Sequence, residues 1–336
     1  MKQIYFVLTE RCNLNCVHCI RGINKENKDV ALNEAIKLID ILYDKFPESA
    51  LILTGGEPTL HNDFRKILIN SAKKFKKVVV TSNATTKYYE EIGEHENYSN
   101  CIFQISLDGD EKTHDAIRGI GNFKKSIMAI MNLIHRDFKV EISTTVNELN
   151  YLSLKCLYEL LVKIGVKKWY VNNELQFGSA YEYGLNPLNI ELWNKLTSVM
   201  QLNCTDIKLK MSKMFNFEDI RIDAIKNSNN TCYNCGSGNE KIYIYPNFNV
   251  YGCTCLKDFS FGNLKNENID TILNSENYHK ISMYKVRDDS PCKKCDYLSL
   301  CNGGCIGMSY NISKGLGFGD IRCPIVKAHY SNIKGD

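Results

Sequence analysis

Residues 3–19 read QIYFVLTERCNLNCVHC, and the interpretation of the whole chain starts from this stretch. Residues 3–9 are mostly apolar, which predicts a buried strand. Three cysteines follow at positions 12, 16 and 19, in a segment that we expect to be a loop. The stretch therefore predicts a strand whose carboxyl end carries three thiols.

From residue 3 onward, strand and helix patterns alternate six times along the chain. Apolar runs predict strands at residues 3–9, 50–53, 78–81, 101–107, 140–146 and 168–171, with helical spacing between them at 29–46, 62–74, 85–93, 121–135 and 153–164. Such alternation is typical of an α/β fold with a parallel sheet and crossover helices. Ligands of these sheets bind beyond the carboxyl ends of the strands. We therefore expect one face to collect Cys12, Gly55, Ser82, Asp108 and Asn147.

Composition and charge exclude several classes of protein. The chain has 336 residues, and its net charge of 42 − 38 = +4 is too small for a nucleic-acid-binding surface. No apolar run approaches the roughly 18 residues of a membrane span. The first residues have neither the basic nor the apolar part of an export signal. We therefore expect a cytoplasmic protein without a nucleic-acid or membrane partner.

The 15 cysteines are the unusual feature of the composition. Their number is odd and the expected compartment keeps thiols reduced, which indicates metal or redox chemistry instead of disulfides. Most of them fall into two groups near opposite ends of the chain. Cys101, Cys156 and Cys204 stand alone in apolar or amphipathic patterns, and we expect them to be small buried hydrophobic residues.

The first cysteine group suits an iron–sulfur cluster with an open position. Three thiolates on a short loop hold three irons of a 4Fe–4S cluster and leave the fourth iron open to a ligand. The alternative is a structural zinc ion with His18 as its fourth ligand. Glu57, after the paired glycines that end the second strand, is suited to accept from an ammonium group. Ser106 and Asp108 end the fourth strand, where they are suited to hold ribose hydroxyls.

The Cys-x3-Cys-x2-Cys motif after the first strand and Gly-Gly-Glu-Pro after the second resemble the radical S-adenosylmethionine (radical SAM) family, over residues 1 to about 180. The resemblance implies a partial (β/α)6 barrel of parallel strands. It implies that Cys12, Cys16 and Cys19 ligate a cluster whose open iron binds SAM. The implied SAM contacts are Gly55, Gly56 and Glu57 to the ammonium, Ser82, Asn83, Ser106 and Asp108 to the methionyl and ribose parts, Arg118 to the carboxylate, and Asn147 to adenosine.

The implied chemistry is that of an oxidoreductase. The reduced cluster passes one electron to the SAM sulfonium, and the resulting 5′-deoxyadenosyl radical abstracts a hydrogen atom from the substrate. An electron donor of the flavodoxin or ferredoxin type is implied as well. The sequence carries no serine-hydrolase elbow, no phosphate-binding loop and no HExxH zinc motif.

The second cysteine group begins with Cys292-x2-Cys295-x5-Cys301-x3-Cys305 and ends with Cys323. By itself the spacing also suits a pair of zinc sites. Behind a radical SAM core it resembles the SPASM extension, a small cysteine-rich C-terminal domain with two auxiliary 4Fe–4S clusters. The family usually has glycine five residues before the second upstream cysteine. Phe248 stands there, so we expect a different hairpin turn.

The SPASM resemblance assigns the remaining cysteines to two sets. The outer set is Cys292, Cys295, Cys301 and Cys323. The inner set is Cys235, Cys253 and Cys305, with Cys232 or Cys255 as the fourth ligand. Cys255 is otherwise a spare structural cysteine or a free thiol that donates a hydrogen atom. The expected domains are a radical SAM core at 1–185, a linker with a bridging helix at 186–230, and the SPASM domain at 231–336.

Several substrates are compatible with this pattern. SPASM proteins mostly modify peptides, which implies maturation of a ribosomal peptide by cross-linking, thioether formation, epimerisation or oxidation. With Cys12 so early, we expect any leader-binding protein to be separate. A sulfatase-maturating enzyme is a competing hypothesis, although Thr254 replaces the catalytic aspartate of that branch. Dehydrogenation of a small molecule and a non-catalytic zinc-binding module are two further hypotheses. The sequence leaves open the substrate, the bond formed, the regeneration of SAM and the oligomeric state.

Overall fold

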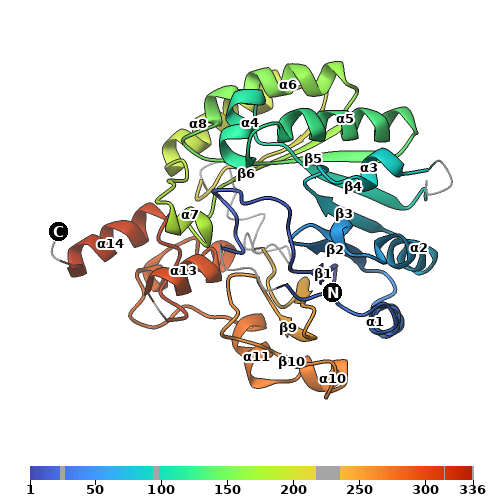
Figure 1. Ribbon diagram of the computed structural model, residues 1–336. Coiled ribbons are helices and arrows are strands. Elements are labelled where there is room, and N and C mark those ends of the chain that lie inside the picture. Colours follow the sequence, from blue (N-terminus) through green and yellow to red (C-terminus); the bar gives the residue numbers. More distant parts are fainter. Residues whose placement is uncertain (23–26, 94–97, 217–234, 314, 335–336) are drawn as a thin grey trace. The chain divides into compact units, whose positions relative to one another are not determined.

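The computed structural model describes residues 1–22, 27–93, 98–216, 235–313 and 315–334 (Figure 1). Two compact units are formed. The first comprises Met1–Leu188, Val199–Met211 and Tyr243–Phe248, and the second comprises Asn189–Ser198, Ser212–Ile242 and Asn249–Asp336. The three domains expected from the sequence stay a prediction. Within the described residues, no helix has the length and apolar character needed to cross a membrane.

The first unit is built on a parallel sheet whose strands follow one another in chain order. They are β1 (Gln3–Thr9), β2 (Ala50–Gly55), β3 (Val78–Ser82), β4 (Cys101–Ser106), β5 (Lys139–Val146), β6 (Lys168–Asn173) and β7 (Lys208–Lys210). On its other side β1 neighbours β8 (Lys241–Ile244). The six predicted strands are confirmed. The sequence did not predict β7, because Lys-Leu-Lys is no apolar run.

The predicted helices cover the outside of these strands, where α2, α3, α5 and α6 follow one another in Figure 1. The observed bounds are α1 (Leu32–Lys45), α2 (Phe64–Lys74), α3 (Tyr88–Glu91), α5 (Asn122–His135), α6 (Leu154–Lys163), α7 (Ser179–Glu182) and α8 (Ile190–Asn203). A further helix, α4 (Glu111–Arg118), was not expected. It buries only His114 and Ile117, so apolar spacing does not reveal it.

The core fixes the carboxyl edge of the sheet. Successive β1 residues Phe6, Val7 and Leu8 are all fully buried, so both faces of the strand are covered. Each such side chain contributes about 1.5–3 kcal/mol through burial. Trp169 in β6 is also fully buried, and its indole N–H donates to the Thr144 hydroxyl of β5 at 2.8 Å. Loops that leave this edge therefore start from fixed points.

The isolated cysteines divide between core and surface. Cys101 in β4 and Cys204 are buried, as predicted. The prediction is wrong for Cys156, which is exposed. Helix α6 buries Leu154, Leu157 and Leu161, and Cys156 falls outside that apolar stripe.

The second unit consists of short elements. They are β9 (Asn249–Tyr251), β10 (Gly262–Asn263), α10 (Ile269–Ile272), α11 (Glu276–Ser282), α12 (Leu298–Cys301), α13 (Ile306–Ser313) and α14 (Pro324–Lys334). The predicted hairpin is formed by β8 and β9, which are neighbours in the sheet. Phe248 in its turn has φ of 68°, the left-handed conformation that glycine adopts readily. A left-handed turn is therefore made here without glycine.

Candidate active site

The paired glycines after β2 pack against the cysteine loop (residues 10–22), which carries the first three cysteines. A Cβ at Gly55 would lie 2.6 Å from the carbonyl oxygen of Thr9, and a Cβ at Gly56 would lie 2.2 Å from that of Arg11. The N–H groups of Gly56 and Glu57 donate to these two carbonyls at 2.8 Å each. Packing of protein on protein therefore accounts for both glycines, and their contact with SAM stays a prediction.

Glu57 is fully buried, and protein donors occupy its carboxylate. Its Oε1 accepts from the hydroxyls of Ser82 and Thr59 at 2.8 and 2.7 Å, and its Oε2 accepts from the N–H of Asn83 at 2.8 Å. Burial raises the pKa of Glu57, although these hydrogen bonds act against the rise. In the structure Glu57 therefore fixes the carboxyl end of β3. Its contact with an ammonium group stays a prediction.

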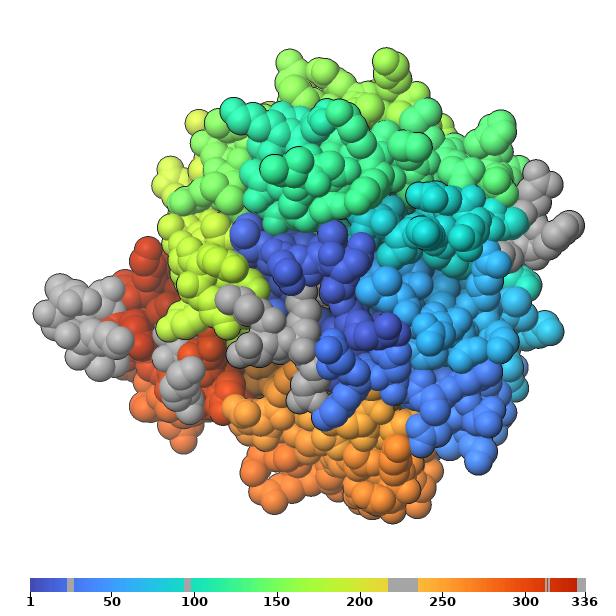
Figure 2. Space-filling model, in the orientation of Figure 1, coloured from blue at the N-terminus to red at the C-terminus, as the bar shows by residue number. Residues whose placement is uncertain are grey.

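The end of β3 is joined to the cysteine loop through Asn83. The Asn83 Nδ2 donates to the Asn13 Oδ1 at 3.0 Å and lies 3.9 Å from the Sγ of Cys12. Cys16 is buried, which raises the pKa of its thiol, and the charges of Cys12 and Cys19 raise it further. The three thiols therefore influence one another. In Figure 2 the dark blue N-terminal segment lies at the surface, beside blue-green residues around position 115.

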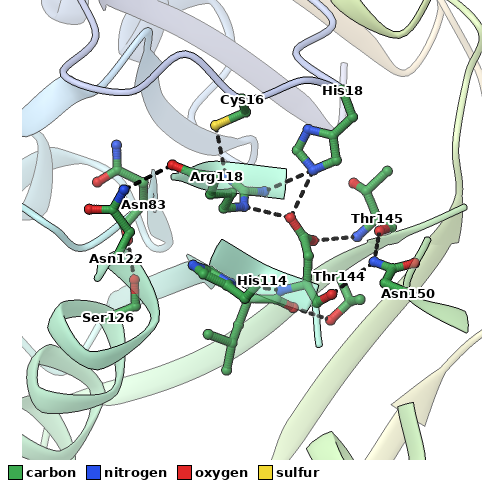
Figure 3. A network of polar contacts seen from close by, with 12 residues as sticks. Cys16, His18, Asn83, His114, Arg118, Asn122, Ser126, Thr144, Thr145 and Asn150 are labelled. Atoms are coloured by element: carbon green, nitrogen blue, oxygen red, sulfur yellow. Dashed lines mark hydrogen bonds and ion pairs between the residues drawn. The ribbon is translucent and has the colours of Figure 1, made fainter. Parts of the chain in front are cut away.

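A buried ion pair lies next to Cys16 (Figure 3). The Nε of Arg118 donates to Oδ2 of Asp108, which also lies 2.8 Å from the Nε2 of His18. The Nη1 of Arg118 lies 3.8 Å from the Sγ of Cys16. Arg118 therefore places a positive charge beside this thiol. Arginine has five N–H donors, and the bond from Nε to Asp108 leaves Nη hydrogens for the carboxylate that the sequence predicts as its ligand.

In the structure, the carboxylate of Asp108 is engaged by Arg118 and His18. It is fully buried, and its Oδ1 accepts from the N–H of Thr145 at 2.9 Å. Burial would raise the pKa of Asp108, but Arg118 and His18 hold it well below its usual range. Burial lowers the pKa of His114 to about 4, and this neutral ring accepts from the N–H of Asp108. The contacts of Asp108 and of the half-buried Ser106 with ribose stay predictions.

Sequence reasoning missed Glu174, which directly follows β6. It is 1% exposed, and no described residue hydrogen-bonds to either of its carboxylate oxygens. Burial raises the pKa of Glu174 to about 7, the neighbouring side-chain amide of Asn147 opposes the rise, and the charge of Asp108 adds to it. Asn147 and Glu174 therefore lie next to one another, although no hydrogen bond of normal geometry joins them. The Nδ2 of Asn147, also buried, has no partner among the described residues. An acidic residue three positions after the predicted strand at 168–171 is the signal that would have identified Glu174.

The cysteine loop fits an iron–sulfur cluster. Each thiolate of such a cluster binds a different iron, so the three thiols need not converge on one point. In the part of the chain that the structure describes, no three Cys, His, Asp or Glu side chains are placed to hold a single metal ion. Gly178 admits the loop, because a Cβ there would lie 2.5 Å from the Cys19 carbonyl oxygen. The Arg118 guanidinium beside Cys16 suits a negatively charged cluster on this loop.

In the second unit the outer set surrounds one cavity. The cavity has a volume of about 150 Å³, and its lining includes Cys292, Cys295, Cys301 and Cys323. Apolar Leu298, Ile325 and Val326 complete much of the wall. A Cβ at Gly319 would lie 2.7 Å from the Sγ of Cys292, so only glycine admits this thiol. Four thiols around an apolar cavity fit a cluster ligated entirely by protein.

The described members of the inner set also lie near one another. The N–H of Cys255 lies 3.4 Å from the Sγ of Cys253. Hydrogen bonding from the side chain of Cys255, and to a smaller extent from its N–H, lowers the pKa of Cys253. The charges of Cys305 and Cys235 raise the pKa of Cys255, after the larger effects of Cys253 and burial. Cys255 is thus close to the other three described cysteines, Cys235, Cys253 and Cys305. Cys232 lies outside the described residues.

Comparison with known proteins identifies the class. The family model of the radical SAM superfamily matches residues 6–152, and that of the SPASM iron–sulfur cluster-binding domain matches residues 232–296. The chain belongs to the radical SAM superfamily and carries a SPASM domain. The radical SAM and SPASM resemblance and the α/β fold are therefore confirmed. So are the cofactors, 4Fe–4S clusters and S-adenosylmethionine.

Individual relatives are named for several different processes. The antilisterial bacteriocin subtilosin biosynthesis protein AlbA of Bacillus subtilis is 29% identical over 92% of this chain and 68% of its own length. An AdoMet-dependent heme synthase of Nitratidesulfovibrio vulgaris is 25% identical over 93% and 89%. A cysteine-type anaerobic sulfatase-maturating enzyme of Clostridium novyi is 26% identical over 88% and 85%.

A solved structure supports the fold. The crystal structure of Streptococcus suis SuiB bound to precursor peptide SuiA has a TM-score of 0.77 to this chain. The alignment covers 97% of this chain and 75% of SuiB, at 17% identity. This likeness extends over the core and the cysteine-rich part alike.

Proposed function

We propose that this radical SAM enzyme is an oxidoreductase that abstracts a hydrogen atom from a peptide and so matures a ribosomally made product. The observation that carries the proposal is the pairing of an incomplete three-cysteine loop with a complete four-cysteine cavity in one chain. The similarity to AlbA, a bacteriocin biosynthesis protein, supports a peptide substrate, because bacteriocins are antibacterial peptides or proteins.

In this proposal Cys12, Cys16 and Cys19 hold the cluster that supplies one electron for the cleavage of SAM. Arg118 binds the SAM carboxylate through its Nη groups, and Asp108 fixes its position. The carboxyl end of β3, held by Glu57, contributes the rest of the methionyl site. The outer and inner sets hold the auxiliary clusters.

The carboxyl edge of the sheet also offers hydrogen bonds that the described protein does not use. Asn147 presents a donor and the neighbouring Glu174 presents acceptors, both buried and without a hydrogen bond of normal geometry between them. Leaving such groups without partners costs about 1–3 kcal/mol each. A bound nucleoside or substrate that supplies both partners removes this cost, so we assign the two residues to ligand binding.

A small molecule is the second candidate substrate. The similarity to a heme synthase over most of both chains favours it. The sulfatase-maturating relative favours a protein substrate instead, but Thr254 occupies the position of the catalytic aspartate in that branch. Thr254 is buried and carries no acidic group, so a sulfatase-maturating reaction would need a base from elsewhere.

The test uses anaerobically reconstituted full-length enzyme. Iron and sulfide are counted first, and about twelve irons per chain are expected for three clusters. The enzyme is then incubated with SAM, dithionite and synthetic precursor peptides, with an iron porphyrin and a sulfatase peptide in parallel. A change in peptide mass together with 5′-deoxyadenosine supports the proposal. Turnover of only the porphyrin or the sulfatase peptide contradicts it.

The partners follow from the same chemistry. The cleavage of SAM needs one electron from outside, so a flavodoxin- or ferredoxin-type donor is part of the proposal. A separate leader-binding protein is its other proposed partner. Replacing dithionite by a flavodoxin with its reductase, with and without a leader-binding protein, tests both.

A further inference from the structure

A buried ion pair in the second unit connects the two sets of C-terminal cysteines. The side chains of Arg322 and Asp320 are 13% and 1% exposed. The Nη2 of Arg322 donates to the Asp320 Oδ2 at 2.7 Å, and its Nε donates to Oδ1 at 3.0 Å. This bidentate pairing fixes the direction of both side chains.

Asp320 positions one cysteine of each set. Its Oδ2 accepts from the N–H of Cys305, of the inner set, at 3.0 Å. Its carbonyl oxygen accepts from the N–H of Cys323, of the outer set, at 2.9 Å. Its side chain comes so close to the turn before Cys305 that a Cβ at Gly304 would lie 2.6 Å from the Asp320 Cβ. Asp320 also lines the outer cavity.

The charges of the pair act differently on the two sets. Burial is the main cause that raises the pKa of Cys301 and of Cys305, and the carboxylate of Asp320 adds to the rise in both. At Cys305 the guanidinium of Arg322 acts in the opposite direction. Asp320 therefore disfavours negative charge in both sets, and Arg322 partly offsets this effect at Cys305.

We propose that Asp320 and Arg322 are positioning residues shared by the two auxiliary clusters, and that their fixed charges set the reduction potentials of both. The inference rests on the proposed function, which assigns the two ligand sets. The potential of an iron–sulfur cluster depends on nearby charge and on burial. A fixed charge acts strongly where water is excluded. Both are positioning residues, since each holds backbone or charge next to a cluster ligand.

The test measures midpoint potentials by EPR-monitored titration of the fully loaded enzyme. Arg322→Gln leaves Asp320 uncompensated, so it lowers the inner potential. Asp320→Asn removes the negative charge, so it raises both potentials. The double variant restores charge balance and returns the inner potential towards the wild-type value. We expect each single change to alter the one-electron equilibrium at least tenfold, which corresponds to 59 mV.

Two control variants separate charge from structure. Arg322→Lys keeps the charge and is expected to hold the potentials near those of the wild type. Arg287→Gln removes a charge from an exposed pair with Asp289, where solvent screens it, and is expected to change neither potential. The inner EPR signal is identified in Cys301→Ala, which lacks an outer ligand.

Iron content separates the ways in which the inference can fail. Wild-type enzyme with about four irons would refute the assignment of auxiliary ligands, and with it the proposed function. About twelve irons, with single-variant shifts below tenfold or in the same direction, would overturn this inference alone. If Asp320→Asn loses iron, the comparison of Arg322→Gln with Arg322→Lys decides the question.

Discussion

The cysteine loop and the cysteine-lined cavity differ in what surrounds their thiols. The loop carries three cysteines, of which Cys16 lies beside the Arg118 guanidinium. The neighbouring buried side chains of Asn147 and Glu174, at the same sheet edge, have polar atoms without a hydrogen bond of normal geometry to described residues. The cavity is lined by four cysteines and mainly by apolar side chains, with Asp320 also in its wall. An incomplete ligand set among unsatisfied polar groups suits an exchangeable polar ligand, and a complete set in an apolar wall excludes one. The cysteine loop thus suits a cluster with one exchangeable ligand, and the cavity suits a cluster whose ligands all come from the protein.

The largest expected effect separates the two regions directly. Cys12→Ala should remove about four irons and reduce 5′-deoxyadenosine formation to background. Cys301→Ala should remove a similar amount of iron but preserve deoxyadenosine formation in the absence of substrate, because Cys301 belongs to the outer set and not to the cysteine loop. Iron analysis and chromatography of SAM products check both. Cys156→Ala, at an exposed position, is the control. Deoxyadenosine at the wild-type rate from Cys12→Ala would show that the open site lies elsewhere.

The next effect concerns the guanidinium beside the cysteine loop. Arg118→Lys keeps the positive charge next to Asp108 but loses the planar fork that pairs with carboxylates. We expect SAM affinity to fall roughly tenfold, which equals about 1.4 kcal/mol. Equilibrium dialysis of the loaded enzyme measures it. Arg65→Lys, on an exposed side chain, should leave the affinity unchanged. Unaltered binding in Arg118→Lys would remove Arg118 from the SAM site.

A smaller effect depends on pH. Burial raises the pKa of Glu174 from its ordinary 4.5 to about 7. Between these values the folded chain holds a proton that the unfolded chain releases, so stability falls as pH rises through this window. Glu174→Gln does not titrate, and wild type should lose roughly 2–3 kcal/mol relative to it between about pH 4.5 and 7. Thermal unfolding across this range measures the difference. A constant gap between the two proteins would refute the raised pKa.

The last prediction is a substitution that leaves the iron content unchanged. The spare-thiol hypothesis predicts that Cys255→Ala leaves the iron content unchanged, although Cys255 lies close to the other described cysteines of the inner set. Cys253→Ala is the matched comparison, and we expect it to lose iron. A loss of about four irons from Cys255→Ala would make Cys255 a ligand of the inner cluster.

The sequence predicted what periodicity and cysteine spacing can express. Six strands and five helices are present near their expected positions, because apolar runs repeat with the periods of buried strands and helices. Helix α4 has only two buried side chains and β7 has three residues, so neither offers a period. The cysteine sets were visible because their ligand spacing is local.

Roles that depend on contacts between distant segments were not visible in the sequence. Gly56 admits the carbonyl of Arg11, a contact between two loops that spacing does not encode. Asp108 resembles a ligand contact, yet its carboxylate is engaged by Arg118 and His18 from separate elements. Glu174 has no local signature beyond its place after a strand.

Phe248 has a consequence for how relatives of this chain are found. Its side chain is buried, and its backbone adopts a conformation that costs most L-residues about 1–2 kcal/mol. Burial of a phenylalanine offsets a cost of that size. A search pattern that demands glycine at this point would pass over chains of this kind. A pattern that specifies a left-handed turn followed five residues later by cysteine would retrieve them, with glycine as one of its solutions.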